Sequence, residues 1–101
     1  VDIAAEQPII AQRQGRQILV EVKSFLGRSF ISDFEDAVGQ YIVYRDILLE
    51  TDSSFDLYLA VAEGTYNSNF QRKLTQMIVR RNRVKLIVFD SQNQVIKQWI
   101  D

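Results

Sequence analysis

Ile18-Leu19-Val20-Glu21-Val22-Lys23-Ser24 is the stretch from which the predicted fold is built. It is nearly continuous in apolar residues on one side, which is typical of an inner strand of a sheet. Alternation along a strand puts Val20 and Val22 on one face and Glu21 and Lys23 on the other. An acid and an amine on one face of an inner strand cost free energy unless they find partners or that face opens into a cleft. The stretch therefore predicts an inner strand whose charged face either opens into a cleft or finds partners.

Turn and strand patterns on both sides of this stretch predict a mixed α/β fold. Gln14-Gly15 fits a hairpin turn, and residues 90–93 fit a second turn. Strands are predicted at residues 1–4, 8–14, 16–24, 55–61, 84–89 and 94–100. Together with two helices, this order predicts one domain over residues 1–101, in which helices pack on a mixed β-sheet. Because the sequence begins inside the first strand, with no Met, we expect it to be a fragment that lacks an N-terminal element.

Two helices are predicted between these strands. Ser32-Asp33-Phe34-Glu35 matches a capping box, so the first helix is expected to begin there and to run to about Glu50. Val43, Tyr44 and Ile47 form a second apolar side of this helix, which predicts burial on more than one face. Apolar residues at helical spacing predict the second helix over residues 66–82.

The composition restricts the chemistry that the chain can perform. It contains no Cys and no His, which excludes disulfides, sulfur-ligated zinc and the Ser-His and Cys-His hydrolases. Carboxylates, Lys, Tyr, Ser and Thr remain, and an enzyme built from these would use a hard cation such as Mg²⁺. No apolar stretch is long enough to span a bilayer and no signal peptide is visible, so we expect a cytoplasmic protein.

Charge is segregated along the chain, although the formal net charge is only -1. Residues 30–63 hold eight acids and one base, Arg45. Between Glu63 and Asp90 there is no acid, and six bases follow one another: Arg72, Lys73, Arg80, Arg81, Arg83 and Lys85. Binding of nucleic-acid phosphates and favourable placement of cations near a helix C-terminus explain this basic block equally well.

Glu21 and Lys23 are the centre of a candidate site. They lie on the same strand face, roughly 6.5 Å apart along the chain, and Asp2 lies at the end of a predicted neighbouring strand. Two carboxylates that converge from adjacent strands can hold Mg²⁺, and the Lys can orient a water or stabilise charge on a phosphate. The alternative is an ordinary pair of solvated or cross-strand charges, since Glu-x-Lys is common by chance.

Gln40 and Tyr44 add a second match. They lie four residues apart on the first predicted helix and therefore share a face, one turn apart. A Gln-x-x-x-Tyr on the helix that follows a Glu-x-Lys strand extends the candidate site. A surface Gln next to a core Tyr remains the simpler interpretation.

The sequence resembles the XisH family in order and over essentially the whole chain. The matching segments are residues 1–6, 9–11, 17–25, 31–34, 37–41, 57–61, 86–90 and 98–99. We expect the family's usual N-terminal helix to be missing from this fragment. XisH proteins are known as controlling factors for excision of the fdxN DNA element, beside a recombinase and a companion XisI protein. The resemblance therefore implies DNA and an XisI-type protein as partners.

The resemblance also implies the restriction-endonuclease-like, or PD-(D/E)XK, superfamily. In its pattern Asp2 is the first acid, Glu21 the second and Lys23 the lysine, and Gln40 and Tyr44 match the motif of its RecB-like branches. Asp2 and Glu21 would then hold the Mg²⁺. Val1 stands where the motif has Pro, which is a mild departure.

Three functions follow, and composition does not separate the first two. The first is control of DNA-element excision through a Mg²⁺-dependent, nuclease-like site, which the intact Asp2, Glu21 and Lys23 set favours. The second is a non-catalytic module on the same fold that binds a partner protein. The third, a small-molecule enzyme, has no Gly-rich phosphate loop in its favour. The sequence leaves the oligomeric state open, a homo-oligomer included.

Overall fold

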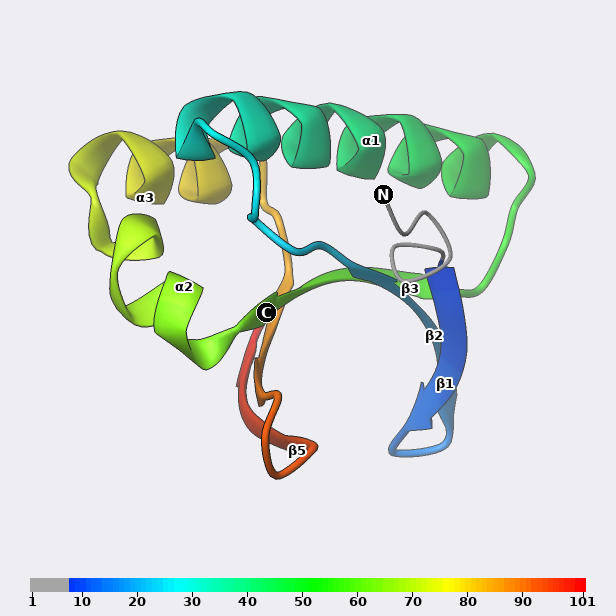
Figure 1. Cartoon of the computed structure of the whole chain (residues 1–101). Coiled ribbons are helices and arrows are strands. Elements are labelled where there is room, and N and C mark those ends of the chain that lie inside the picture. The colour runs from blue at the N-terminus through cyan, green and yellow to red at the C-terminus, as the bar shows by residue number, and fades with distance from the viewer. Residues whose placement is uncertain (1–7) are drawn as a thin grey trace.

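A mixed five-stranded sheet forms the centre of the computed structural model, which describes residues 8–101 (Figure 1). Its strands lie in the sheet in the order of the chain: β1 Pro8–Arg13, β2 Arg16–Val22, β3 Asp56–Ala62, β4 Leu86–Asp90 and β5 Val95–Ile100. β3 pairs in parallel with β2 and β4, while β1 and β5 pair antiparallel with their neighbours. The predicted mixed α/β fold is confirmed, and the strand predicted at residues 1–4 lies outside the described residues.

The helices all lie on one side of this sheet (Figure 1). They are α1 Phe30–Glu50, α2 Glu63–Asn67, the short 3-10 turn η2 Asn69–Gln71 and α3 Lys73–Arg81. Parallel neighbours need a crossover connection, and α1 makes the one from β2 to β3 while α2, η2 and α3 make the one from β3 to β4. Among the residues that the structure describes, no helix is long and apolar enough to cross a membrane.

Apolar side chains fill both faces of the sheet. On the face covered by helices, Leu57, Leu59 and Val61 pack against Phe34 and Tyr41 of α1. On the other face, a second cluster consists of five buried residues: Ile18, Val20, Tyr58, Ala60 and Ile87. Because β3 contributes to both clusters, its residues 57–61 are all buried, which explains their continuous apolar run.

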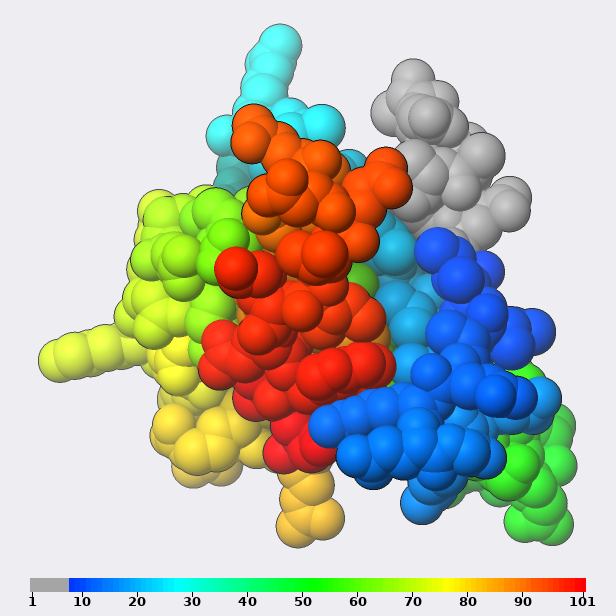
Figure 2. All heavy atoms as spheres, turned by 90° about the horizontal axis from the view of Figure 1, so that it is seen from below, coloured from blue at the N-terminus to red at the C-terminus, as the bar shows by residue number. Residues whose placement is uncertain are grey.

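The face without helices is closed by the two edge strands. Figure 1 shows the sheet curling so that β1 and β5 approach each other, and Figure 2 shows them side by side across this face. The Arg13 guanidinium lies 4.1 Å from the centre of the Trp99 ring and donates a hydrogen bond of 2.9 Å to the Tyr58 hydroxyl. It also forms an ion pair of 3.0 Å with Asp101. The curl therefore shields most of the second apolar cluster without another helix.

The helix α1 begins earlier than its sequence predicts. Its N-cap is Ser29, whose hydroxyl oxygen accepts a hydrogen bond of 3.2 Å from the Ser32 N–H. The Ser32–Glu35 capping box is therefore wrong. The cause is tertiary: the Phe30 ring packs against the Phe34 ring and against Phe70 across the layer, so that burial stabilises an additional first turn.

The second predicted helix is broken into α2, η2 and α3. The backbone leaves the helical region at Ser68 (φ -107°, ψ -81°) and again at Arg72 (φ -68°, ψ 147°). Asn and Ser side chains compete for backbone hydrogen bonds, and the Ser68 hydroxyl donates to the Gly64 carbonyl oxygen at 2.8 Å. Because of this break, the Phe70 side chain is 1% exposed and packs against the rings of Phe25 and Phe34.

One side of α1 is more exposed than predicted. Val43 and Ile47 are 54% and 53% exposed, whereas Tyr44 is half-buried and packs against the core on the sheet side. The prediction that a second face of this helix is buried is therefore wrong for Val43 and Ile47 in the described structure. The reason is that a single layer of helices covers the sheet, so the outer side of α1 faces solvent.

Tyr41 joins α1 to the sheet. Its side chain is 1% exposed, and its hydroxyl donates a hydrogen bond to the Leu57 carbonyl oxygen and accepts one from the Lys85 N–H, both at 3.1 Å. The hydroxyl thus connects the helix to the start of β3 and to the residue before β4. Burial raises the pKa of Tyr41, because the charged phenolate is poorly solvated there.

We expect Tyr41→Phe to destabilise the fold by about 1–3 kcal/mol, since it leaves buried hydrogen-bonding groups without their partner. The raised pKa of Tyr41 also predicts an alkaline loss of stability. Its contribution is complete below the unfolded pKa near 10 and is lost as the pH rises through the folded pKa, since the unfolded tyrosine ionises first. Urea unfolding from pH 7 to 11 measures both effects.

The half-buried Tyr66 provides a matched control, Tyr66→Phe, which should change the unfolding free energy less. Burial also raises the pKa of Tyr58, so a weaker alkaline decline should persist in Tyr41→Phe. An unchanged unfolding free energy in Tyr41→Phe at pH 7 would refute the structural role of its hydroxyl.

Candidate functional site

Glu21 is a buried acid on an inner strand. It lies on β2 between Pro8 of β1 and Leu59 of β3, and its side chain is 2% exposed. Its neighbours Val20 and Val22 pack in the apolar cluster on the face without helices. Alternation therefore directs Glu21 to the face that the helices cover, together with its strand partner Leu59. The predicted division of the two strand faces is confirmed.

Lys23 follows β2 directly and extends its pairing. Its backbone N–H donates a hydrogen bond of 3.1 Å to the Ala60 carbonyl oxygen, so the residue keeps the strand direction. The side chain is half-buried and lies two residues beyond Glu21, on the same side of the strand. β2 is an inner strand, as predicted, although the middle strand of the five is β3.

The two residues predicted on the helix differ in their surroundings. Tyr44 is half-buried and packs against the core between α1 and the sheet, which is also the layer that Glu21 enters. Gln40 lies one turn earlier and is exposed to solvent. The structure thus brings Glu21 and Tyr44 into one layer and leaves Gln40 at its outer margin.

The predicted metal site pairs Glu21 with a second acid. Asp2, the predicted partner, lies outside the described residues. Within residues 8–101 no group of three or more acids is arranged to hold a metal ion. Glu21 supplies the hard oxygen ligand that Mg²⁺ prefers, and one carboxylate together with waters and substrate phosphates suits that ion.

Glu63 is an acid that the sequence interpretation missed. It is half-buried and begins α2, directly after the last residue of β3. β2 and β3 are parallel, with Val22 opposite Ala60, so Glu63 and Lys23 follow strands that end at the same edge of the sheet. The signal was present in the sequence, since Glu63 follows the buried run 57–61 almost directly.

The six basic residues of the predicted nucleic-acid surface separate into two groups. Arg72, Lys73 and Arg80 are exposed residues at the start and along the outer side of α3, and the Arg72 guanidinium lies 5.6 Å from the centre of the Phe30 ring. Arg81, Arg83 and Lys85 instead line a pocket of about 500 Å³ beside the amino ends of β3 and β4. Arg80 lines a second pocket together with Arg83 and Lys85, so the two groups adjoin at the end of α3.

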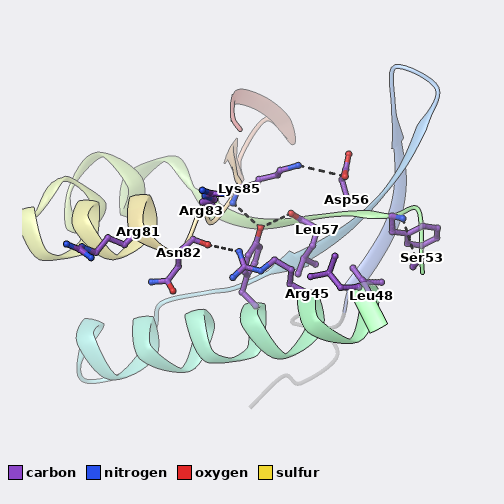
Figure 3. Close-up of a pocket in the computed structure, with 12 residues that line it drawn as sticks. Arg45, Leu48, Ser53, Asp56, Leu57, Arg81, Asn82, Arg83 and Lys85 are labelled. Carbon is purple, nitrogen blue, oxygen red and sulfur yellow. Dashed lines mark hydrogen bonds and ion pairs between the residues drawn. The ribbon is translucent and has the colours of Figure 1, made fainter. Parts of the chain in front are cut away.

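That pocket contains residues that sequence reasoning did not connect. Arg45 of α1 lies 5.4 Å from the centre of the Tyr41 ring and donates a hydrogen bond to the Asn82 carbonyl oxygen at the end of α3 (Figure 3). Lys85 lies 3.8 Å from the carboxylate of Asp56, which also pairs with Arg16 at 3.1 Å. Arg45 was visible only as the single base of an acidic segment.

Comparison with known proteins assigns the chain to a family. The family model described as XisH protein matches residues 1–97. No curated protein sequence matches significantly. Two solved structures are similar over 93% of this chain and 74% of their own chains, each with a TM-score of 0.88. One is an XisH family protein from Nostoc punctiforme PCC 73102, 43% identical, and the other an fdxN element excision controlling factor protein from Anabaena variabilis, 46% identical. The match over nearly the whole chain, on the same fold, shows that this protein belongs to the XisH family.

Proposed function

We propose that this protein controls the excision of a DNA element and carries a Mg²⁺-dependent, nuclease-like site. The description of the Anabaena variabilis relative as an fdxN element excision controlling factor supports the first part. The second part depends on one observation, the burial of Glu21 on an inner strand. Removing a carboxylate from water costs free energy, and buried ionisable groups are concentrated at functional sites.

The fold is compatible with an endonuclease-like protein of the PD-(D/E)XK type. A mixed sheet with helices packed on it presents a Glu-x-Lys pair at the end of an inner strand, next to the helix that carries Gln40 and Tyr44. In this proposal Asp2 and Glu21 are the two acids and Lys23 is the lysine. The half-burial of Tyr44 in the layer that Glu21 enters favours its inclusion.

Each proposed residue has a distinct role in phosphodiester hydrolysis. A bound Mg²⁺ polarises the phosphodiester and lowers the pKa of an attacking water. The carboxylates of Asp2 and Glu21 would hold this ion, as carboxylates suit it. The Lys23 ammonium orients the water or stabilises the charge that develops on phosphate, and its half-burial strengthens that interaction. Gln40 and Tyr44 position the substrate strand at the margin of the site.

DNA is the proposed substrate, with a recombinase and an XisI-type protein as partners in excision. The exposed cations Arg72, Lys73 and Arg80 on α3 are available to phosphates. Arg81, Arg83 and Lys85 extend this basic surface toward the other end of α3. Contacts of this kind supply affinity and orientation without reading the sequence of the DNA.

A non-catalytic interaction module is the second candidate. Val43 and Ile47 expose apolar surface one turn apart on the outer side of α1. Exposed apolar side chains that lie together are typical of surfaces that bind another protein. This function would use the same fold and need no metal.

Cleavage of DNA should require Mg²⁺ or Mn²⁺ and should stop in EDTA. Glu21→Gln should abolish it, because the neutral amide lacks the negative charge with which a carboxylate holds Mg²⁺. Lys23→Ala should lower the rate roughly 10²–10³-fold by removing a fixed cation from the transition state. The measurement is cleavage of plasmid and single-stranded DNA, with and without an XisI-type protein.

The matched control is Glu50→Gln, which makes the same change at an exposed acid at the end of α1. Thermal unfolding of every variant separates loss of activity from loss of fold. Cleavage that survives Glu21→Gln or EDTA would place the chemistry elsewhere. Complete inactivity together with a tight protein complex would favour the interaction module.

Binding of DNA should depend on salt through the cations of α3. Arg80→Ala should weaken binding and reduce the slope of log affinity against log salt by about 0.9 for each phosphate that Arg80 neutralises. Lys97→Ala removes the same charge from the exposed side of β5 and should leave that slope unchanged. Fluorescence anisotropy at several salt concentrations measures both, and equal slopes for Arg80→Ala and the wild type would remove Arg80 from the interface.

A further inference from the structure

A cationic pocket lies on the side of α1 that faces α3, and it is distinct from the Glu21 site. Its lining comes from the end of α1, the start of β3 and the segment 81–85 between α3 and β4. We propose that this cationic pocket binds the phosphate group of a nucleotide, either free or at the end of a nucleic-acid strand. The proposal does not require the protein to be a nuclease.

The charges of the lining favour an anion. Four basic residues (Arg45, Arg81, Arg83 and Lys85) and one acid (Asp56) surround the pocket, although the chain as a whole is slightly negative. Asp56 already pairs with Arg16 as well as with Lys85, so it offsets little of this charge. Figure 3 shows the Arg81 side chain directed away from the other labelled residues, which leaves Arg45, Arg83 and Lys85 as the cations for a ligand.

The end of α3 would ordinarily repel an anion, because the last carbonyl groups of a helix carry partial negative charge. Here Arg45 donates a hydrogen bond to the Asn82 carbonyl oxygen and covers this negative end with a guanidinium. The Tyr41 hydroxyl likewise donates a hydrogen bond to the Leu57 carbonyl oxygen. Two acceptors at the pocket wall are thus satisfied from within the protein.

Arg83 has a backbone conformation that is unfavourable for its side chain. Its φ is 52°, in the left-handed region that Gly adopts most easily and that commonly terminates a helix. A non-Gly residue there costs of order 1 kcal/mol, and such strain is concentrated at functional sites. A long cation at this position, beside a pocket that Arg45 and Lys85 also line, fits a role in binding.

The remaining lining fits the organic part of a nucleotide. Leu48, Leu49, Phe55 and Leu57 provide the apolar part of the lining. The volume of about 500 Å³ lies within the range of small-molecule sites and can hold a mononucleotide. Phe55 is half-buried and offers a ring for contact with a base.

The two sites lie on different sides of α1. Tyr44 and Arg45 are successive residues of this helix, so their side chains point about 100° apart. Tyr44 belongs to the candidate nuclease site and Arg45 to the cationic pocket. Along the sheet, Asp56 is opposite Ile18, three residues before Glu21, which corresponds to about 10 Å. A change in one site therefore need not alter the other.

Isothermal titration calorimetry in EDTA tests the pocket with probes of defined chemistry. Pyrophosphate and thymidine 5′-monophosphate should bind, and thymidine should not. A single-stranded oligonucleotide with a 5′-phosphate is compared with the same strand carrying a 5′-hydroxyl. Preference for the phosphorylated strand identifies a strand end as the ligand, and equal affinity for the two strands identifies the free nucleotide.

Two variants and one control give the proposal its sharpest test. Arg83→Gly removes the cation and suits the φ of 52°, so the fold should be kept. Lys85→Gln removes the second cation, and Lys97→Gln makes the same change on β5, outside the pocket. We expect at least a tenfold loss of pyrophosphate affinity in the first two and none in the third.

The outcomes separate this proposal from the nuclease proposal. Glu21→Gln should leave pyrophosphate binding unchanged even if it abolishes cleavage. If neither pyrophosphate nor thymidine 5′-monophosphate binds the wild type, or if both bind Arg83→Gly as tightly as the wild type, the pocket is not a phosphate site.

Discussion

The parallel pairing of β3 with both of its neighbours sets the architecture of this protein. Parallel strands cannot be joined by a tight turn, so each pairing requires a connection that crosses the sheet. Both connections are helical and both lie on one face, where they bury Leu57, Leu59 and Val61 of β3. The apolar cores, the position of α1 over the sheet and the two polar sites all follow from this arrangement.

Placing both crossovers on one face leaves the second face to be covered by other means. The edge strands β1 and β5 curl toward each other, and Arg13 bridges them through Trp99, Tyr58 and Asp101. An Arg is suited to this position, since its planar group packs on a ring while it binds a carboxylate. The Tyr58 hydroxyl also donates to the Asp101 carboxylate, and this hydrogen bond lowers the pKa of Asp101. These polar contacts hold the edge strands together over the apolar face that has no helices.

The two sites occupy different places in the same framework. Glu21 lies at the end of β2 and Lys23 directly after it, near the edge where the parallel strands end. The cationic pocket lies where β3 and β4 begin. Tyr41 lines the cationic pocket, and its hydroxyl ties α1 to Leu57 of β3 and to Lys85, the residue before β4. Since the chain has no Cys and no His, the two proposals rely on different groups: Mg²⁺ held by carboxylates at the Glu21 site, and basic side chains in the cationic pocket.

Local sequence patterns were enough to predict the fold class and the position of the central acid. Period-two alternation and the apolar run are properties of short segments, so the strand of Glu21, its two faces and the buried run of β3 could be predicted without a structure. Glu21, Lys23, Gln40 and Tyr44 could also be named as candidates, because their spacings lie within one strand and one helix. The sequence did not predict which of these residues share a layer. Gln40 is exposed and Tyr44 is half-buried, although both lie on one side of the helix.

Features that depend on residues distant in sequence became visible only in the folded chain. Helix α1 starts at Phe30 because its ring meets Phe70, forty residues later. The second predicted helix breaks so that Phe70 can enter this cluster, which an unbroken helical period does not foresee. The cationic pocket joins Arg45 to Asn82, 37 residues apart. Local pattern carries no information on such pairs, since the energy that selects them comes from packing and charge across the layer between sheet and helices.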